Sequence, residues 1–214
     1  MTEIARQIAK DLIDINAVTL SPKRPFTWAS GIKSPIYTDN RRTIAFPAVR
    51  THIADGLAAY IKANFPEATV VAGVATAGIP HAAIVADKLG LPMSYVRSKP
   101  KDHGTGKQVE GQVLPTDKVV LIDDLISTGG SVLGAAKAVQ KMGAEVLGVL
   151  GIFSYELPDS ATNFANAGLS LHTLTNYSTL IQLANENHDI TQTELNSLQQ
   201  WRKDPWHWVP TKTK

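Results

Sequence analysis

The stretch with the clearest chemical potential is VVLIDDLISTGGS at residues 119–131. An apolar run leads to two adjacent carboxylates, Asp123 and Asp124, and then to hydroxyls and glycines that precede a helical pattern. The unpaired N–H groups at the start of a helix, at the positive end of its dipole, bind phosphate groups. We therefore expect an anion to be bound by the five residues after this strand: Ser127, Thr128, Gly129, Gly130 and Ser131.

The two carboxylates must serve a different group, because they would repel a phosphate. The vicinal hydroxyls of a ribose are suitable, since they are neutral and donate hydrogen bonds to carboxylates, and they allow a Mg²⁺ nearby. The spacing thus fits a ribose 5-phosphate. The stretch is not a Walker loop, because the lysine after the second glycine is absent, and it is not GxGxxG. The alternative is an ordinary strand, turn and helix with Ser and Thr at the helix cap.

Strands and helices alternate around this stretch, as in a parallel sheet with covered faces. The sequence predicts an α/β fold with an open, mostly parallel twisted sheet flanked by helices. We expect strands at 93–96, 119–123 and 146–153 and another strand near 70. Helices are expected over 46–65 and 130–142, with a further helix that follows residues 68–80 and ends at about 89.

Ligands of such sheets bind beyond the carboxyl ends of the strands. Three polar or glycine-containing loops follow predicted strands here, at residues 75–78, 98–112 and 124–130. We therefore expect these loops to converge in space.

The two ends of the chain add smaller elements to this body. Residues 4–15 have the apolar spacing of an amphipathic helix, and residues 18–43, rich in Pro, Ser and Gly, predict a small hairpin substructure. The tail from residue 170 predicts a short strand and two helices, and three of the four tryptophans lie within its residues 201–208. Aromatic residues near a terminus dock it onto the body or a dimer mate. We expect residues 1–214 to form one domain.

Composition excludes several classes of function. The 214 residues are 43% hydrophobic and 19% charged, with a net charge of +2 spread along the chain, so nucleic-acid binding is not indicated. The absence of cysteine excludes disulfides and thiolate catalysis and suits a reducing compartment. The N-terminus is neither a signal peptide nor a membrane span, so we expect a cytoplasmic protein without membrane contact. The histidines at positions 52, 81, 172 and 188 lack paired metal spacing and are expected at the surface or at helix caps.

A second stretch with chemical potential is YVRSKPKDHGTGKQVEG at residues 95–111. Its cations suit a basic lid hinged at Gly104 and Gly106. Positive charge there would stabilise a departing polyanion such as pyrophosphate. The alternative is a solvated charged loop. The cations are Arg97, Lys99, Lys101, His103 and Lys107.

Residues 119–131 resemble the phosphoribosyl-diphosphate (PRPP) signature of type I phosphoribosyltransferases. Residues 95–111 resemble the catalytic loop of the orotate phosphoribosyltransferase family, with its Arg, Lys-Asp-His-Gly and Glu-Gly. The segment FTWASGIKSPIYTDNR (26–41) resembles that family's base-covering segment, and GVATAGIPHA (73–82) is similar to its pyrophosphate loop. The resemblance spans residues 26 to about 155, in the family's order.

This resemblance implies the type I phosphoribosyltransferase fold with a small N-terminal hood, residues 18–43. It implies transfer of a phosphoribosyl group from PRPP to orotate, giving orotidine 5′-phosphate and pyrophosphate, in pyrimidine biosynthesis. Mg²⁺ would be held mainly by PRPP, near Asp123 and Asp124, and we assign it no protein ligand. A homodimer is also implied, with the lid, residues 98–112, serving the neighbouring subunit's site.

The resemblance assigns roles by position. Asp123 and Asp124 hold the ribose hydroxyls, residues 127–131 hold the 5-phosphate, and Arg97, Lys101 and His103 meet pyrophosphate. Lys101 and His103 also share a proton with the leaving group, which makes them, with the two aspartates, the catalytic set. Further substrate contacts are expected from Lys99, Leu125, Ile126, Thr76, Ala77, Gly78, Lys33, Tyr37 and Arg41.

The chain departs from the enteric-type pattern at four positions. Ala29, Ala77 and Ser98 stand where lysine is expected, and Tyr155 stands about where an arginine accompanies orotate's carboxylate. We therefore expect another donor for orotate: Lys33 or Arg41 with backbone N–H groups of residues 26–39. Thr128 is the phosphate-loop side chain best placed to reach the base.

Two rival functions remain at this stage. A phosphoribosyltransferase for a purine base shares the PRPP signature but is not expected to carry KDHG together with SGIKSP. A PRPP-sensing regulator that binds RNA or DNA should show a contiguous basic face or an added DNA-binding domain, and neither is visible in the sequence.

Overall fold

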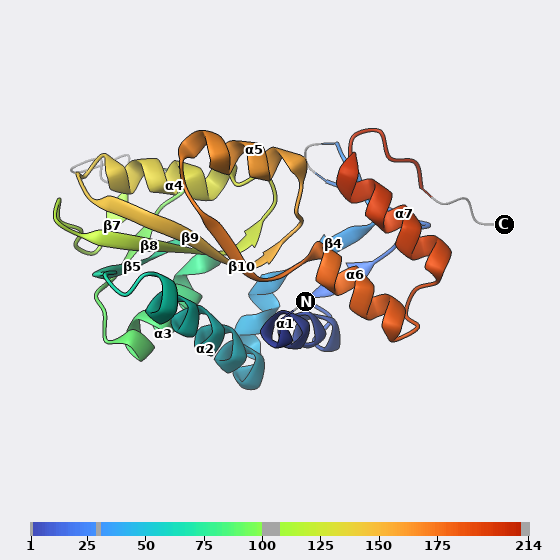
Figure 1. The fold of residues 1–214 in the computed structure, drawn as a ribbon, viewed down its shortest axis with the longest axis horizontal. Helices are drawn as coiled ribbons and strands as arrows, with labels where there is room; N and C mark the ends of the chain where they lie inside the picture. The colour runs from blue at the N-terminus through green and yellow to red at the C-terminus, as the bar shows by residue number, and fades with distance from the viewer. Residues whose placement is uncertain (1, 29–30, 100–107, 211–214) are drawn as a thin grey trace.

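The computed structural model describes residues 2–28, 31–99 and 108–210. Its centre is a six-stranded sheet in the order β10-β9-β8-β5-β6-β7 (Figure 1). All neighbouring pairs are parallel except β6 and β7. The strands are β5 (Val70–Val74), β6 (Met93–Val96), β7 (Val109–Glu110), β8 (Lys118–Ile126), β9 (Glu145–Ser154) and β10 (Leu171–Asn176). The predicted α/β fold with an open, mostly parallel sheet is confirmed.

Helices cover both faces of this sheet (Figure 1). The helices α4 (Gly130–Gln140) and α5 (Pro158–Ala167) lie on one face, and α2 (Pro47–Asn64) and α3 (Gly78–Leu89) lie on the other. The helix α1 (Glu3–Asp14) packs beside β10 and α6 (Tyr177–Glu186), and α7 (Gln192–Lys203) follows α6. In the described part of the chain, no helix is both long and apolar enough to cross a membrane.

The strand β8 explains why the central run is continuously apolar. Val119 and Leu121 join the core on the α4 and α5 side, whereas Val120 and Ile122 join the core on the other side. All four side chains are fully buried, because a central parallel strand is covered on both faces.

β8 is longer than its apolar pattern predicts. It continues past the carboxylates to Ile126, because β9 runs equally far and pairs with it at Leu125↔Phe153 and Ile126↔Ser154. The loop predicted at 124–130 therefore shortens to residues 127–129. The loop predicted at 98–112 likewise contains β7, which pairs with β6.

The hood consists of two small antiparallel pairs and a short helix. β1 (Val18–Leu20) pairs with β4 (Ile36–Thr38), β2 (Phe26–Thr27) pairs with β3 (Lys33–Ser34), and the 3₁₀ helix η1 (Asn40–Ala45) leads into α2. The predicted hairpin substructure is therefore present, and it lies beside the C-terminal helices rather than in the main sheet (Figure 1).

Candidate active site

A pocket of about 370 Å³ lies where the carboxyl ends of β5 and β8 meet the hood. Its walls come from four segments: residues 38–41, residues 75–77 after β5, residues 123–125 of β8, and Ser131 of α4. Two of the three loops expected to converge therefore do so. Of the third, the described residues 98–99 and 108–112 do not line this pocket.

Asp123 and Asp124 both line this pocket, Asp123 as a buried residue and Asp124 as a half-buried one. Asp123 is 7% exposed, and the backbone N–H of Asp124 donates to its Oδ1 atom at 2.9 Å. Burial, followed by repulsion from Asp124, raises the pKa of Asp123 to about 8. Burial also raises the pKa of Asp124, and the positive charge of Arg41 works against that shift. A pair of acids with raised pKa values on a pocket wall is typical of a functional site.

The raised pKa of Asp123 makes the stability of the free protein depend on pH. Between about pH 4 and pH 8 the folded state keeps a proton that the unfolded state has released, so the free energy of unfolding falls as pH rises through this window. Asp123→Asn removes this pH-dependent contribution to the free energy of unfolding. We expect the melting temperature of the variant, relative to that of the parent, to rise from pH 5 to pH 8.

Thermal melts of both proteins at a series of pH values measure this difference. Asp159→Asn, an exposed carboxylate in the first turn of α5, is the matched control and should show no such trend. A difference that stays constant with pH would mean that Asp123 is ionised throughout.

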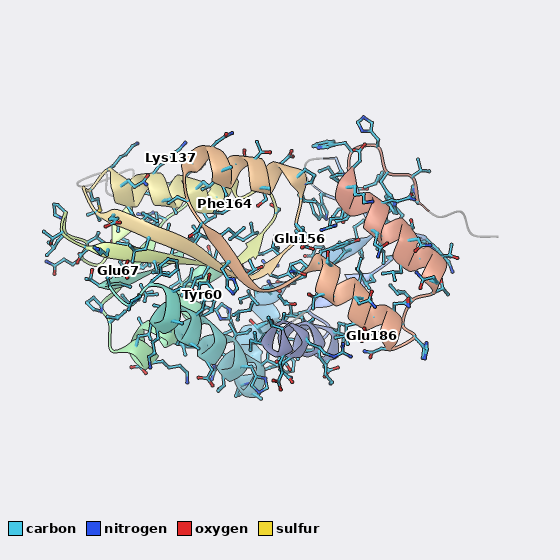
Figure 2. The ribbon with its side chains drawn as sticks, viewed as in Figure 1. Tyr60, Glu67, Lys137, Glu156, Phe164 and Glu186 are labelled. Atoms are coloured by element: carbon cyan, nitrogen blue, oxygen red, sulfur yellow. The ribbon has the colours of Figure 1, made fainter. Side chains whose placement is uncertain are left out.

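The turn between β8 and α4 is supported from behind by α5. Gly129 has a φ of +82°, and a Cβ atom on it would lie 2.6 Å from Cε2 of Phe164. Figure 2 shows Phe164 on the side of α5 that faces the sheet. Beside it, Asn163 donates its Nδ2 to the Thr128 carbonyl at 2.9 Å. The shape of the turn therefore depends on two α5 residues that the motif does not contain.

The structure places the predicted anion-binding residues unevenly. Ser131 lines the main pocket, whereas Gly130 lines a second cleft of about 400 Å³ between α4 and α5. Leu125 lines the main pocket, and the Ile126 side chain is buried in the core, so only its backbone can reach a ligand.

The turn after β5 is packed directly against β8. A Cβ atom on Gly78 would lie 2.4 Å from the Ile122 carbonyl oxygen, so only glycine fits at the start of α3. Thr76 and Ala77 line the main pocket, and the Ala75–Thr76 peptide bond is cis. The turn after β5 and the adjoining part of β8 thus form one continuous wall of the pocket.

Asn40 is a pocket residue that the sequence did not reveal. It is 1% exposed, and its Nδ2 donates to the Asp124 carbonyl at 2.6 Å. Thr43 Oγ1 donates to the Asn40 carbonyl and lies 3.3 Å from His81 Nε2. These contacts join η1 to the end of β8. His81, expected at the surface or a cap, is instead buried, and burial lowers its pKa to about 4.

The base-side residues expected from the sequence do not all reach the pocket. Arg41 lines it and donates its Nε to Asp39 Oδ1 at 2.5 Å. Lys33 and Tyr37 do not line it: Lys33 Nζ donates to Thr27 Oγ1 at 2.7 Å, and the Tyr37 ring lies 5.6 Å from that of Phe26. Tyr155 is buried, and its ring centre lies 4.9 Å from that of Trp28.

The lid is described only at its two ends. Arg97 Nη1 lies 3.6 Å from Glu110 Oε1, and the Arg97 N–H donates to the Gln108 carbonyl. Lys99 is exposed. Lys101 and His103, predicted as catalytic, lie outside the described residues, as does Lys107.

Comparison with known proteins agrees with this site. Residues 47–154 match the family model of the phosphoribosyl transferase domain. The matched residues include both loops of the pocket wall. The chain is 70% identical over 205 residues to the orotate phosphoribosyltransferase of Levilactobacillus brevis, covering 96% of this chain and 98% of that one. It is 62% identical over 208 residues to the orotate phosphoribosyltransferase of Enterococcus faecalis, covering 97% and 99%.

Similarity extends to solved structures. The crystal structure of orotate phosphoribosyltransferase from Aeropyrum pernix superposes with a TM-score of 0.75 at 30% identity, covering 84% of this chain and 98% of that one. The fold, the acid pair in the pocket and the sequence relatives lead to one assignment: the chain belongs to the orotate phosphoribosyltransferase family.

Proposed function

We propose that the pocket between β5, β8 and the hood binds PRPP and orotate side by side. As a member of its family, the protein transfers the phosphoribosyl group of PRPP to orotate, giving orotidine 5′-phosphate and pyrophosphate in pyrimidine biosynthesis. The observation that carries the proposal is the acid pair of buried Asp123 and half-buried Asp124 beside the start of α4 in one pocket.

The ribose 5-phosphate part of PRPP fits the β8–α4 end of the pocket. Residues 127–131 supply hydroxyls and the free N–H groups of the first turn of α4 to the phosphate. Asp123 and Asp124 accept hydrogen bonds from the ribose hydroxyls, which relieves the cost of burying two carboxylates. Thr76 and Ala77, across the pocket, are placed to contact pyrophosphate through their backbone.

Mg²⁺ fits this site as a companion of PRPP. Carboxylate oxygens are the donors that Mg²⁺ prefers, and Asp123 and Asp124 supply them at one side of the pocket. Among the described residues, no group of three or more His, Cys, Asp or Glu side chains is placed to hold a metal ion. We propose that the ion is held largely by the substrate, where it would neutralise pyrophosphate charge.

The chemistry requires positioning and positive charge more than a protein nucleophile. The orotate ring nitrogen forms a bond to ribose C1 while the bond from C1 to the pyrophosphate oxygen breaks. The bonding electrons leave with pyrophosphate, and C1 becomes oxocarbenium-like between the two. We propose that Arg97, Lys99, Lys101 and His103 meet the charge on that leaving group, with Lys101 and His103 sharing a proton with it.

The base side of the site is assigned to the hood. Arg41 lines the pocket opposite Asp124, and we propose it as a donor to orotate's carboxylate, with backbone N–H groups of residues 26–39. Lys33 and Tyr37, from the same hood, would contact the base only after their side chains change position. Thr128 would approach the base from the phosphate side.

We further propose that the protein is a cytoplasmic homodimer of single-domain subunits, residues 1–214. In this dimer, the lid of each subunit serves its neighbour's site.

A spectrophotometric assay with PRPP and Mg²⁺ tests the function. Loss of orotate absorbance is expected with orotate, and no reaction is expected with xanthine, hypoxanthine, adenine or uracil. Use of a purine base instead of orotate would overturn the base assignment. PRPP binding without any base consumed would point to the PRPP-sensing alternative.

A further inference from the structure

Trp201 of α7 is the most deeply buried tryptophan of the C-terminal tail. It is fully buried, and its Nε1 donates to the Lys33 carbonyl in the hood at 2.9 Å. Its ring meets the Trp28 ring of the hood edge-on, with 5.7 Å between centres. Trp201 thus contacts the hood at two points, a ring just after β2 and a backbone carbonyl in β3.

The same indole also contacts the body of the protein. Its ring centre lies 5.2 Å from that of Tyr177 and 6.2 Å from that of Tyr155, which follows β9. The Tyr177 hydroxyl donates to the Leu198 carbonyl of α7 at 3.0 Å. Trp201 therefore lies at the junction of α7, the end of the main sheet and the hood.

Ion pairs join α7 to its two neighbours. On the hood side, Lys23 Nζ lies 3.2 Å from Glu194 Oε1. On the body side, Arg202 Nη1 lies 3.5 Å from Glu156 Oε2, which also accepts from the Ser178 N–H. Figure 2 shows Glu156 between the end of β9 and the C-terminal helices. The two ends of α7 are thus attached to different neighbours, the first turn to the hood and the last turn to the body.

The hairpin β2–β3 needs such support. Among the described residues, its strands pair with each other and not with the main sheet. Two-stranded hairpins are marginally stable on their own, so packing against another element decides their position. The C-terminal helix supplies that packing here, as its place beside the hood in Figure 1 indicates.

We propose that Trp201 is a positioning residue for the base site. By holding Trp28 and the Lys33 carbonyl, it fixes the hood where residues 26–41 cover orotate. The inference rests on the base-covering role proposed for the hood. It assigns to the C-terminal tail a part in base binding and none in PRPP binding, because the phosphate side is built from β5, β8, α4 and α5.

Three variants test this inference. Trp201→Leu removes the ring and the N–H donor, Trp201→Phe keeps a ring and removes the donor, and Trp206→Leu is the control from the same tail, at a side chain that is 58% exposed. KM for orotate, KM for PRPP and kcat are measured for each. Trypsin cleavage after Lys33, followed by mass spectrometry, reports separately whether the hood is docked.

For Trp201→Leu we expect KM for orotate to rise about ten-fold or more, because only the docked fraction of the protein binds the base. Trp201→Phe should raise it about five-fold, the effect of one lost hydrogen bond. KM for PRPP and kcat should change little, and cleavage after Lys33 should be faster in both variants. Trp206→Leu should match the parent.

The other outcomes separate the inference from its premise. Unchanged cleavage after Lys33 with unchanged KM for orotate would overturn the positioning role and leave the hood's role intact. Faster cleavage with unchanged KM for orotate would overturn the base-covering role itself, and the inference with it. An equal rise in both KM values would show general loosening of the fold, which also overturns the inference.

Discussion

Replacing Asp123 and Asp124 together by asparagine is expected to lower kcat/KM for PRPP by roughly 10² to 10⁴, because each lost hydrogen bond to a charged acceptor costs about 1.5–3 kcal/mol. The side-chain amides of asparagine have the size of the carboxylates but carry no charge. The orotate site that we propose lies on the hood side of the pocket and should remain formed. Steady-state kinetics with PRPP varied, and calorimetric titration with orotate, measure the two effects.

Asp159→Asn is the matched control for this double variant, because it makes the same chemical change at an exposed carboxylate on α5. It should leave kcat/KM within about two-fold of the parent, as surface substitutions do. Unchanged PRPP kinetics in the double variant would remove the ribose assignment. The pH dependence of the melting temperature would then remain as a separate test of the protonation of Asp123.

Lys101→Ala is expected to lower kcat by roughly 10² to 10³ while the dissociation constant of PRPP changes little, as for other donors aimed at transition-state charge. The lid's contacts are proposed to strengthen only as pyrophosphate departs, so the loss should fall on turnover. Single-turnover kinetics and equilibrium PRPP binding separate the two quantities. Lys107→Ala removes the same charge from the same lid and should have a smaller effect, because Lys107 is not among the four side chains that we propose to contact the leaving group.

An equal loss of PRPP binding and turnover would contradict this role for Lys101. The variant also tests the exchange of lids between subunits. Mixed dimers of Lys101→Ala chains and Asp123→Asn, Asp124→Asn chains should recover activity, because one of their two sites then receives an intact lid and an intact acid pair. Mixtures that stay inactive would place the lid in its own subunit's site.

The sequence predicted those parts of the fold that have a local pattern. The alternation of strands and helices, the hairpins of the hood and the acid pair in the pocket follow from periodicity, from glycine positions and from the PRPP signature. The extension of β8 to Ile126 was missed, because it depends on pairing with β9, and nothing in the run after Asp123 signals a strand partner.

The supporting residues could not be predicted, because each acts across a long separation in the chain. Asn40 reaches the Asp124 carbonyl from 84 residues away, and Trp201 reaches the Lys33 carbonyl from 168 residues away. Asn163 supports the Thr128 carbonyl from 35 residues away. No spacing rule within one element links such pairs, so only the folded chain brings them together.

The α7–hood contact has a consequence for how this enzyme could acquire a new acceptor. The general phosphoribosyl transferase region, residues 47–154, contains both loops of the phosphate side, whereas the hood and α7 lie on either side of it in the chain. In the site that we propose, donor chemistry and acceptor choice thus belong to separate layers of the molecule. Mutations in the hood and α7 can alter which base is accepted while the PRPP-binding loops of residues 47–154 stay intact. Base selectivity can therefore evolve, or be engineered, by exchanging the hood and the C-terminal helices together.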